Sequence, residues 1–203
     1  MSVRPTRELP ETYQRIKTID ITQDRDLVIR MNIFGTGLFF FFAVLFAVLG
    51  LWLRGLTGHG TASLALTFGL DNSLRFALVA LGSTALMIVL HEGLHGFFFW
   101  LFTGSKPVFE FHWYYASAAA PGWYLPRNPF MVTTLAPFLV LSLLSLVLLA
   151  VGPAGWLPWV WATATFNASG SIGDLMVAGW LFGQPADCLV LDEGYAVTLY
   201  NPS

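Results

Sequence analysis

Long apolar runs separated by short polar stretches dominate the chain. The first run covers residues 33–53, and apolar character returns over residues 74–102 and 130–151. A fourth run, residues 156–182, is more polar and is interrupted by one proline and three glycines. About 20 apolar residues are needed to cross the roughly 30 Å hydrocarbon core of a bilayer. The pattern therefore predicts four transmembrane helices over these ranges, the fourth of them partly unwound.

The segment between the second and third runs has a different pattern. Residues 108–115 are β-prone, small residues follow up to Pro121-Gly122, and a second aromatic patch stands at Trp123-Tyr124. Two β-prone runs around a bend predict a hairpin or re-entrant loop near the membrane. A last β-prone run covers residues 195–200. The expected fold is an all-α membrane protein with four transmembrane helices, a small β element between the second and third, and a short tail.

Residues 1–32 are polar, with six of the ten Lys/Arg and five of the twelve acids of the chain. The first apolar run starts only after Met31, which is late for a cleavable signal peptide. We expect a cytoplasmic arm over residues 1–32, a membrane domain over residues 33–183 and a cytoplasmic tail over residues 184–203. The arm could gate substrate entry as a plug or dock a partner, but its mixed charges favour a solvated tail.

Composition supports a membrane protein. The chain is 56% hydrophobic and 11% charged, whereas an ordinary soluble domain has about 25% charged residues. A net charge of −2 gives no reason to expect a nucleic-acid partner. The single cysteine, Cys188, excludes an intramolecular disulfide and a multi-cysteine metal site. Eight of the ten Lys/Arg fall on the side of the two termini, so the positive-inside rule places both in the cytoplasm. We expect a multi-pass protein of a prokaryotic cytoplasmic membrane.

The second predicted helix carries His91-Glu92-Gly93-Leu94-His95, a match to the HExxH pattern. Positions i and i+4 lie on one face of a helix, so both imidazoles can bind one zinc ion. Glu92 is then placed to activate a water molecule as general base. A charge inside a bilayer costs at least about 2.5–3.5 kcal/mol, which favours function over a polar patch that only joins helices.

A catalytic zinc site usually has three protein ligands, so a third is needed. Asp174 is the only acid of the fourth apolar run, and neighbouring glycines allow the backbone to bend there. Glu110 and His112 lie in the middle loop, on the expected side of the site, whereas His59 lies in the opposite loop. Asn167, seven residues before Asp174, is a candidate for holding the substrate backbone or an oxyanion. It is equally suited to cap an unwound stretch of the helix.

These residues resemble the site-2 protease type of intramembrane zinc metalloprotease, which pairs HExxH on one helix with an Asp, preceded by an Asn, on a later one. The chain is more similar to small four-helix bacterial and archaeal membrane proteins classed as zincin peptidases of unknown function. That likeness covers roughly residues 80–200, and its motifs correspond here to residues 124–127, Ala136-Pro137 and residues 171–174. The likeness implies that His91, His95 and Asp174 bind zinc and that Glu92 activates a water molecule. It also includes Asn167 among the site residues. The chain departs from site-2 proteases in having Leu175 after Asp174, glycines in place of prolines in the preceding segment, and no PDZ or CBS domain.

The expected function is hydrolysis of peptide bonds in or near a transmembrane segment, with Zn²⁺ as cofactor and a membrane protein as substrate. The β-prone run that contains Phe109 and Phe111 is suited to pair with an extended substrate by strand addition. One alternative is a non-catalytic membrane protein, either a metal carrier or a zinc-binding scaffold. The first and third helices lack ionisable residues along a path, which argues against a carrier, and the presence of Glu92 argues against a scaffold. Another alternative is a zinc hydrolase of a non-peptide membrane substrate, such as a lipid headgroup.

Overall fold

The computed structural model describes residues 4–20, 22–59, 73–111 and 116–203. The chain divides into two compact units. The first, here called the sheet unit, comprises Met1–Asn32, Glu92–Pro137 and Gly173–Ser203. The second, the helical unit, comprises Ile33–His91 and Phe138–Ile172. Two long helices, α3 and α4, pass from one unit into the other without interruption.

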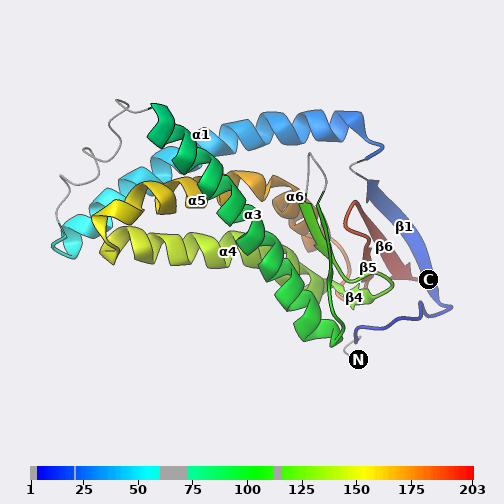
Figure 1. The fold of residues 1–203 in the computed structure, drawn as a ribbon. Coiled ribbons are helices and arrows are strands. Elements are labelled where there is room, and N and C mark those ends of the chain that lie inside the picture. The colour runs from blue at the N-terminus through cyan, green and yellow to red at the C-terminus, as the bar shows by residue number, and fades with distance from the viewer. Residues whose placement is uncertain (1–3, 21, 60–72, 112–115) are drawn as a thin grey trace. The chain divides into compact units, whose positions relative to one another are not determined.

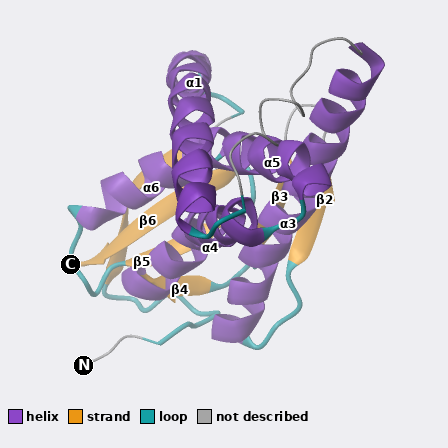
Figure 2. Cartoon of the chain, turned by 90° about the vertical axis from the view of Figure 1, so that its left-hand side faces the viewer, coloured by secondary structure: helices purple, strands orange, loops and turns teal. Residues whose placement is uncertain are grey.

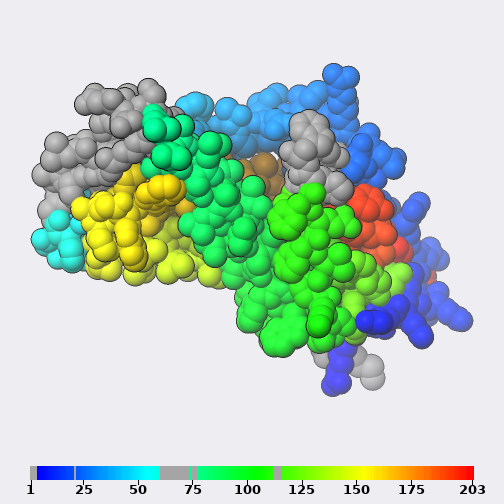
Figure 3. Space-filling view, viewed as in Figure 1, coloured from blue at the N-terminus to red at the C-terminus, as the bar shows by residue number. Residues whose placement is uncertain are grey.

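Three helices of the described chain are long and apolar enough to cross a membrane: α1 (Arg25–Leu56), α3 (Ser73–Thr103) and α4 (Arg127–Val151). They contain the first three predicted spans and extend them by at most eight residues at either end (Figure 1). Their large apolar side chains are exposed, as expected for helices with lipid as solvent. On the face drawn in Figure 3, α3 lies at the surface along much of its length. Exposed residues include Phe34, Phe40 and Trp52 on α1, Leu81, Val89 and Trp100 on α3, and Leu139, Leu143 and Val147 on α4.

The fourth predicted span is two helices rather than one. A 3₁₀ turn (Ala154–Trp156) leads into α5 (Leu157–Gly170, 14 residues), and α6 (Ile172–Phe182, 11 residues) follows. The break falls at Ser171, whose backbone N–H and hydroxyl both donate to the carbonyl of Asn167. Each piece is shorter than the roughly 20 residues that a span requires. The prediction of an irregular fourth segment is therefore confirmed, while a fourth continuous helix is not found.

The described part of the helical unit has an apolar core and a buried arginine. Phe46, Leu149 and Leu157 pack with two alanines of α5. Gly82 allows the Trp159 ring to approach, because a Cβ there would lie 2.5 Å from the ring. The guanidinium of Arg54, at the end of α1, donates to the carbonyls of Leu149 and Gly152, which α4 leaves without helical partners at its end.

A four-stranded antiparallel sheet forms much of the sheet unit, in the order β1-β6-β5-β4 (orange in Figure 2). Its strands are β1 (Tyr13–Asp20), β4 (Tyr124–Pro126), β5 (Leu189–Asp192) and β6 (Ala196–Pro202). Thr6 pairs with Tyr124 through two backbone hydrogen bonds of 3.0 and 2.8 Å. The beginning of the chain thus lines both edges of the sheet, and a solvated tail is the wrong description for residues 6–20.

The predicted hairpin is present between α3 and α4, but a different segment forms its second strand. β2 (Val108–Phe111) pairs with β3 (Ala116–Ala119), which is the small-residue stretch expected to form the bend. The aromatic patch instead supplies β4, where the Tyr124 ring meets that of Tyr200 edge-on. Strand β3 consists of four small residues, three of them buried, so a strand forms here despite low β-propensity.

The core of the sheet unit joins the sheet to the helices. Phe99 of α3, Phe130 of α4 and Leu181 of α6 pack with Leu125, Val190 and Leu199 of the strands, and all six are at most 2% exposed. Because Phe99 lies one turn after His95, this core fixes the α3 segment that carries the HExxH motif.

The reactivity of the Cys188 thiol can be used to test whether β1 stabilises the sheet unit. This thiol is fully buried, and burial raises its pKa to about 11, so reaction with a maleimide at pH 7 should be slow. Deleting residues 1–20 leaves β6 as an unpaired edge of the sheet. We then expect maleimide labelling of Cys188, measured by mass spectrometry, to become at least about tenfold faster. Deleting residues 1–5 keeps Thr6 and β1 and should leave the rate unchanged. Equal rates for the two deletions would contradict the role given to β1.

Candidate metal centre

The two histidines of the HExxH motif lie one turn apart on α3. His91 and His95 are both less than a tenth exposed, in a helix whose other faces are apolar. Because the helix is continuous from Ser73 to Thr103, the i and i+4 spacing directs both imidazoles to one side. The structure thus brings the two predicted histidine ligands to one side of α3.

A hydrogen bond fixes each imidazole through its Nδ1 atom. His91 Nδ1 lies 3.0 Å from Oδ1 of Asn167, and His95 Nδ1 lies 3.0 Å from the carbonyl oxygen of Thr133. A carbonyl oxygen only accepts, so Nδ1 is the protonated nitrogen in both rings. The lone pair that binds a metal is then on Nε2. Such contacts to the non-ligating nitrogen are typical of metal-binding histidines.

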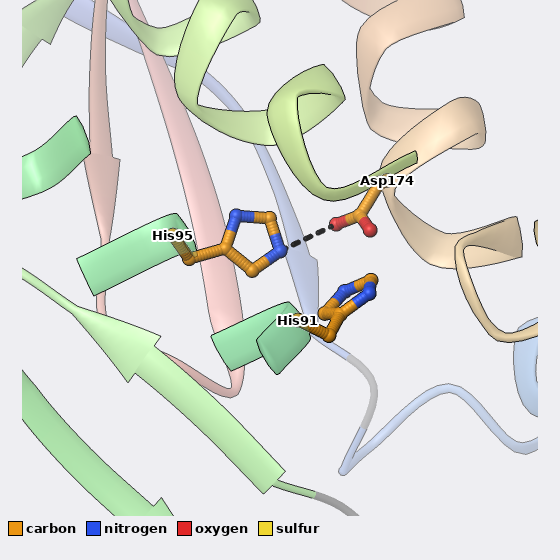
Figure 4. A group of neighbouring side chains, drawn as sticks. All are labelled: His91, His95 and Asp174. Carbon is orange, nitrogen blue, oxygen red and sulfur yellow. Dashed lines mark ion pairs between the residues drawn. The ribbon is translucent and has the colours of Figure 1, made fainter. Parts of the chain in front are cut away.

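Asp174 approaches the same point from the first turn of α6. Its Oδ1 lies 3.4 Å from His95 Nε2, and the ligand atoms of His91, His95 and Asp174 all lie within 4.8 Å of one another (Figure 4). The preceding residue, Gly173, faces the Met31 side chain, and a Cβ there would lie 3.2 Å from it. The third ligand predicted from the sequence is therefore brought to the histidines.

The three side chains fit a tetrahedral metal ion. Two ligands at 2.0–2.1 Å from a tetrahedral zinc ion lie about 3.4 Å apart, which is the distance between His95 Nε2 and Asp174 Oδ1. Without a metal this contact is an ion pair between a protonated His95 and Asp174, and a bound cation takes the place of the Nε2 proton. Two imidazoles and one carboxylate leave a fourth position for water or substrate, as in catalytic zinc sites.

The remaining candidates take different places. Glu92 is buried on α3, close enough to His95 for their charges to interact. Asn167 is fully buried: its side chain contacts His91, and its carbonyl accepts the hydrogen bonds at the break before α6. Glu110 is exposed on β2 and outside the triad, and His112 lies outside the described residues. His59 contacts Thr57 at the end of α1.

Strand β2 packs beside the motif. A Cβ on Gly96 would lie 2.5 Å from the ring of Phe109, so the glycine after His95 makes room for this aromatic side chain. Phe109 remains 45% exposed and Phe111 65% exposed. Two of the three residues predicted to contact substrate, Phe109 and Phe111, therefore lie on an exposed strand that docks on α3 next to His95.

Sequence reasoning missed one acidic residue near the centre. Asp192, at the end of β5, interacts electrostatically with His95, Asp174 and Glu92, and its Oδ1 accepts a 2.7 Å hydrogen bond from the N–H of Gly194. Burial raises the pKa of this carboxyl to about 6. The only signal in the sequence was an acid that ends a short apolar run, which is too common a pattern to single out.

Metal analysis of purified protein tests the triad. His91→Ala, His95→Ala and Asp174→Ala should each lose the single zinc ion, because each removes one of three ligands. Asn167→Ala keeps the ligands but removes the partner of His91 Nδ1, so zinc affinity, measured by chelator competition, should fall about 10- to 100-fold. His59→Ala should bind zinc as the wild type does. If Asp174→Ala retained zinc and Glu110→Ala lost it, the third ligand would be Glu110 on the hairpin and not Asp174.

Comparison with known proteins supplies the family. Residues 84–189, just over half of the 203-residue chain, match the family described as “Putative zincin peptidase”. This range contains His91, His95 and Asp174. No curated protein and no solved structure matches the chain. Zincins are zinc peptidases, so the family names the metal for which the triad offers three ligands. The chain belongs to the zincin peptidase family, and its cofactor is Zn²⁺.

Proposed function

We propose that the protein is an intramembrane zinc metallopeptidase that cleaves peptide bonds in or near transmembrane segments of other membrane proteins. The observation that carries the proposal is the buried HExxH motif on an apolar spanning helix, with Asp174 completing a three-ligand set. A position at membrane depth suits a substrate that is itself embedded in the bilayer. The resemblance to site-2 proteases supports the proposal, and we keep the predicted orientation with both termini in the cytoplasm.

Each residue around the metal centre has a distinct role in the proposed reaction. A bound Zn²⁺ supplies a Lewis acid that polarises the scissile carbonyl and lowers the pKa of water. Glu92 accepts the proton of the attacking water and passes it to the leaving amine. Asn167 and the Thr133 carbonyl hold the two imidazoles in the required tautomer. Asn167 is already bound to His91, so we assign it a positioning role in place of direct contact with substrate.

The substrate has to present an extended backbone, because a helix hides its peptide bonds in internal hydrogen bonds. In the described chain, β2 pairs with β3 alone, which leaves its other edge for a further strand. All four residues of β2 are exposed, and Phe109 docks beside His95. An unwound substrate segment that pairs with β2 is therefore delivered next to the metal centre, with Phe109 and Phe111 as apolar contacts.

Glu92→Gln tests the proposed general base. The amide cannot accept a proton, so cleavage should fall about 10²- to 10⁴-fold while one zinc ion is retained. The measurement is fragment detection by mass spectrometry with a panel of single-span reporter proteins in nanodiscs. Glu11→Gln, the same change at an exposed site, should cleave at the wild-type rate. A zinc-loaded wild type that cleaves none of the reporters would favour the scaffold or the non-peptide hydrolase.

Gly96→Ala tests the docking of β2. The added methyl group meets the Phe109 ring, so the strand has to move, and cleavage should fall at least about tenfold without loss of zinc. Gly93→Ala is the matched control on the same helix, because its Cβ would meet nothing within 4 Å. Proline substitutions at alternate positions from Val108 should likewise reduce cleavage and spare the metal. Unchanged cleavage in the Gly96 and proline variants would discard strand addition.

A further inference from the structure

A proline lies inside α4, ten residues after the helix begins: Pro137. In an α-helix the N–H of residue i bonds the carbonyl of residue i−4. The carbonyl that residue 137 would bond is that of Thr133. Proline has no N–H, and its ring crowds the carbonyl of residue i−4 and tilts it away from the helix axis. The sequence of α4 therefore leaves the Thr133 carbonyl without its helical donor.

The same carbonyl is the acceptor for His95. His95 Nδ1 lies 3.0 Å from the Thr133 oxygen. Thr133 is 1% exposed, so water is not an alternative donor there. A buried carbonyl without a donor is costly, above all at membrane depth, and prolines in spanning helices are tolerated where a neighbouring element supplies one. In this chain the neighbouring element is the metal-binding helix, and the donor is the imidazole itself.

We propose that Pro137 is a positioning residue of the metal centre: by withholding an N–H from the Thr133 carbonyl, it reserves that carbonyl for His95 and so fixes the tautomer that directs Nε2 to the metal. Pro137, Thr133 and His95 all belong to the sheet unit. The inference rests on the metal centre and not on peptide hydrolysis. It therefore stands or falls by metal binding, whatever substrate the protein cleaves.

Pro137→Ala separates this role from a structural one. The substitution restores an N–H that competes with His95 for the Thr133 carbonyl. Zinc affinity, measured by chelator competition on the detergent-purified full-length protein, should fall about 10- to 100-fold. Alanine also favours a helix interior more than proline does, so the zinc-free variant should unfold at a higher temperature than the zinc-free wild type. A proline needed only for folding predicts the opposite change in stability.

Pro129→Ala is the matched control. It makes the same change on the same helix, but in the first turn, where an N–H has no helical acceptor. Zinc affinity should remain at the wild-type value. Equal zinc affinities for Pro137→Ala and the wild type would overturn the inference, as would an equal loss in Pro129→Ala.

A second measurement does not depend on the stability of the variant. The chain has four histidines, so ¹⁵N-histidine labelling gives a simple imidazole spectrum, and His95→Gln identifies the His95 signals. In the zinc-free wild type at alkaline pH, His95 should carry its proton on Nδ1. In Pro137→Ala the proton should shift in part to Nε2. A His95 proton on Nε2 in the wild type would also overturn the inference.

Discussion

The contact between His95 and Asp174 is the constraint on which the rest of this structure depends. It brings a carboxylate oxygen to 3.4 Å from an imidazole nitrogen, the spacing of two ligands on one zinc ion. A buried polar pair of this kind is costly unless charge pairing and hydrogen bonds compensate it. Most of the irregular features near the centre supply that compensation or allow the two residues to meet.

The irregular backbone of the fourth segment is one such feature. A continuous helix through residues 157–182 would keep its carbonyls occupied and its axis straight. The break at Ser171 instead starts a new helix, with Asp174 in its first turn, where an acid is favoured by the helix dipole. Leu181, near the other end of α6, is buried in the core of the sheet unit. The ligand-bearing helix is thus anchored at its far end by apolar packing and begins at the backbone break.

The sheet supports the metal centre, although its strands lie far from the HExxH motif in the sequence. Its strands come from the first 20 residues, from the segment before α4 and from the last 15 residues, and their core contacts α3 and α4 close to His95 and Thr133. The packed core of the sheet unit supports the segments of α3 and α6 that carry His95 and Asp174. It also brings Asp192, from a distant part of the sequence, into the electrostatic surroundings of the centre.

The sequence by itself determined the elements that follow from local periodicity and composition. Twenty apolar residues in a row have to span or be buried, so α1, α3 and α4 were predictable, and the i, i+4 spacing of His91 and His95 was sufficient to place both on one face. Asp174 followed from its isolation in an apolar run, because an unneeded charge there is costly.

Only the tertiary structure decided the pairing of distant segments. The first strand joins the last, β3 rather than the aromatic patch completes the hairpin, and Pro137 leaves a carbonyl to a histidine on another helix. These choices depend on side-chain size, on edge pairing and on which buried polar group lacks a donor. Each is a property of two segments in contact, and a single segment of sequence carries no record of it.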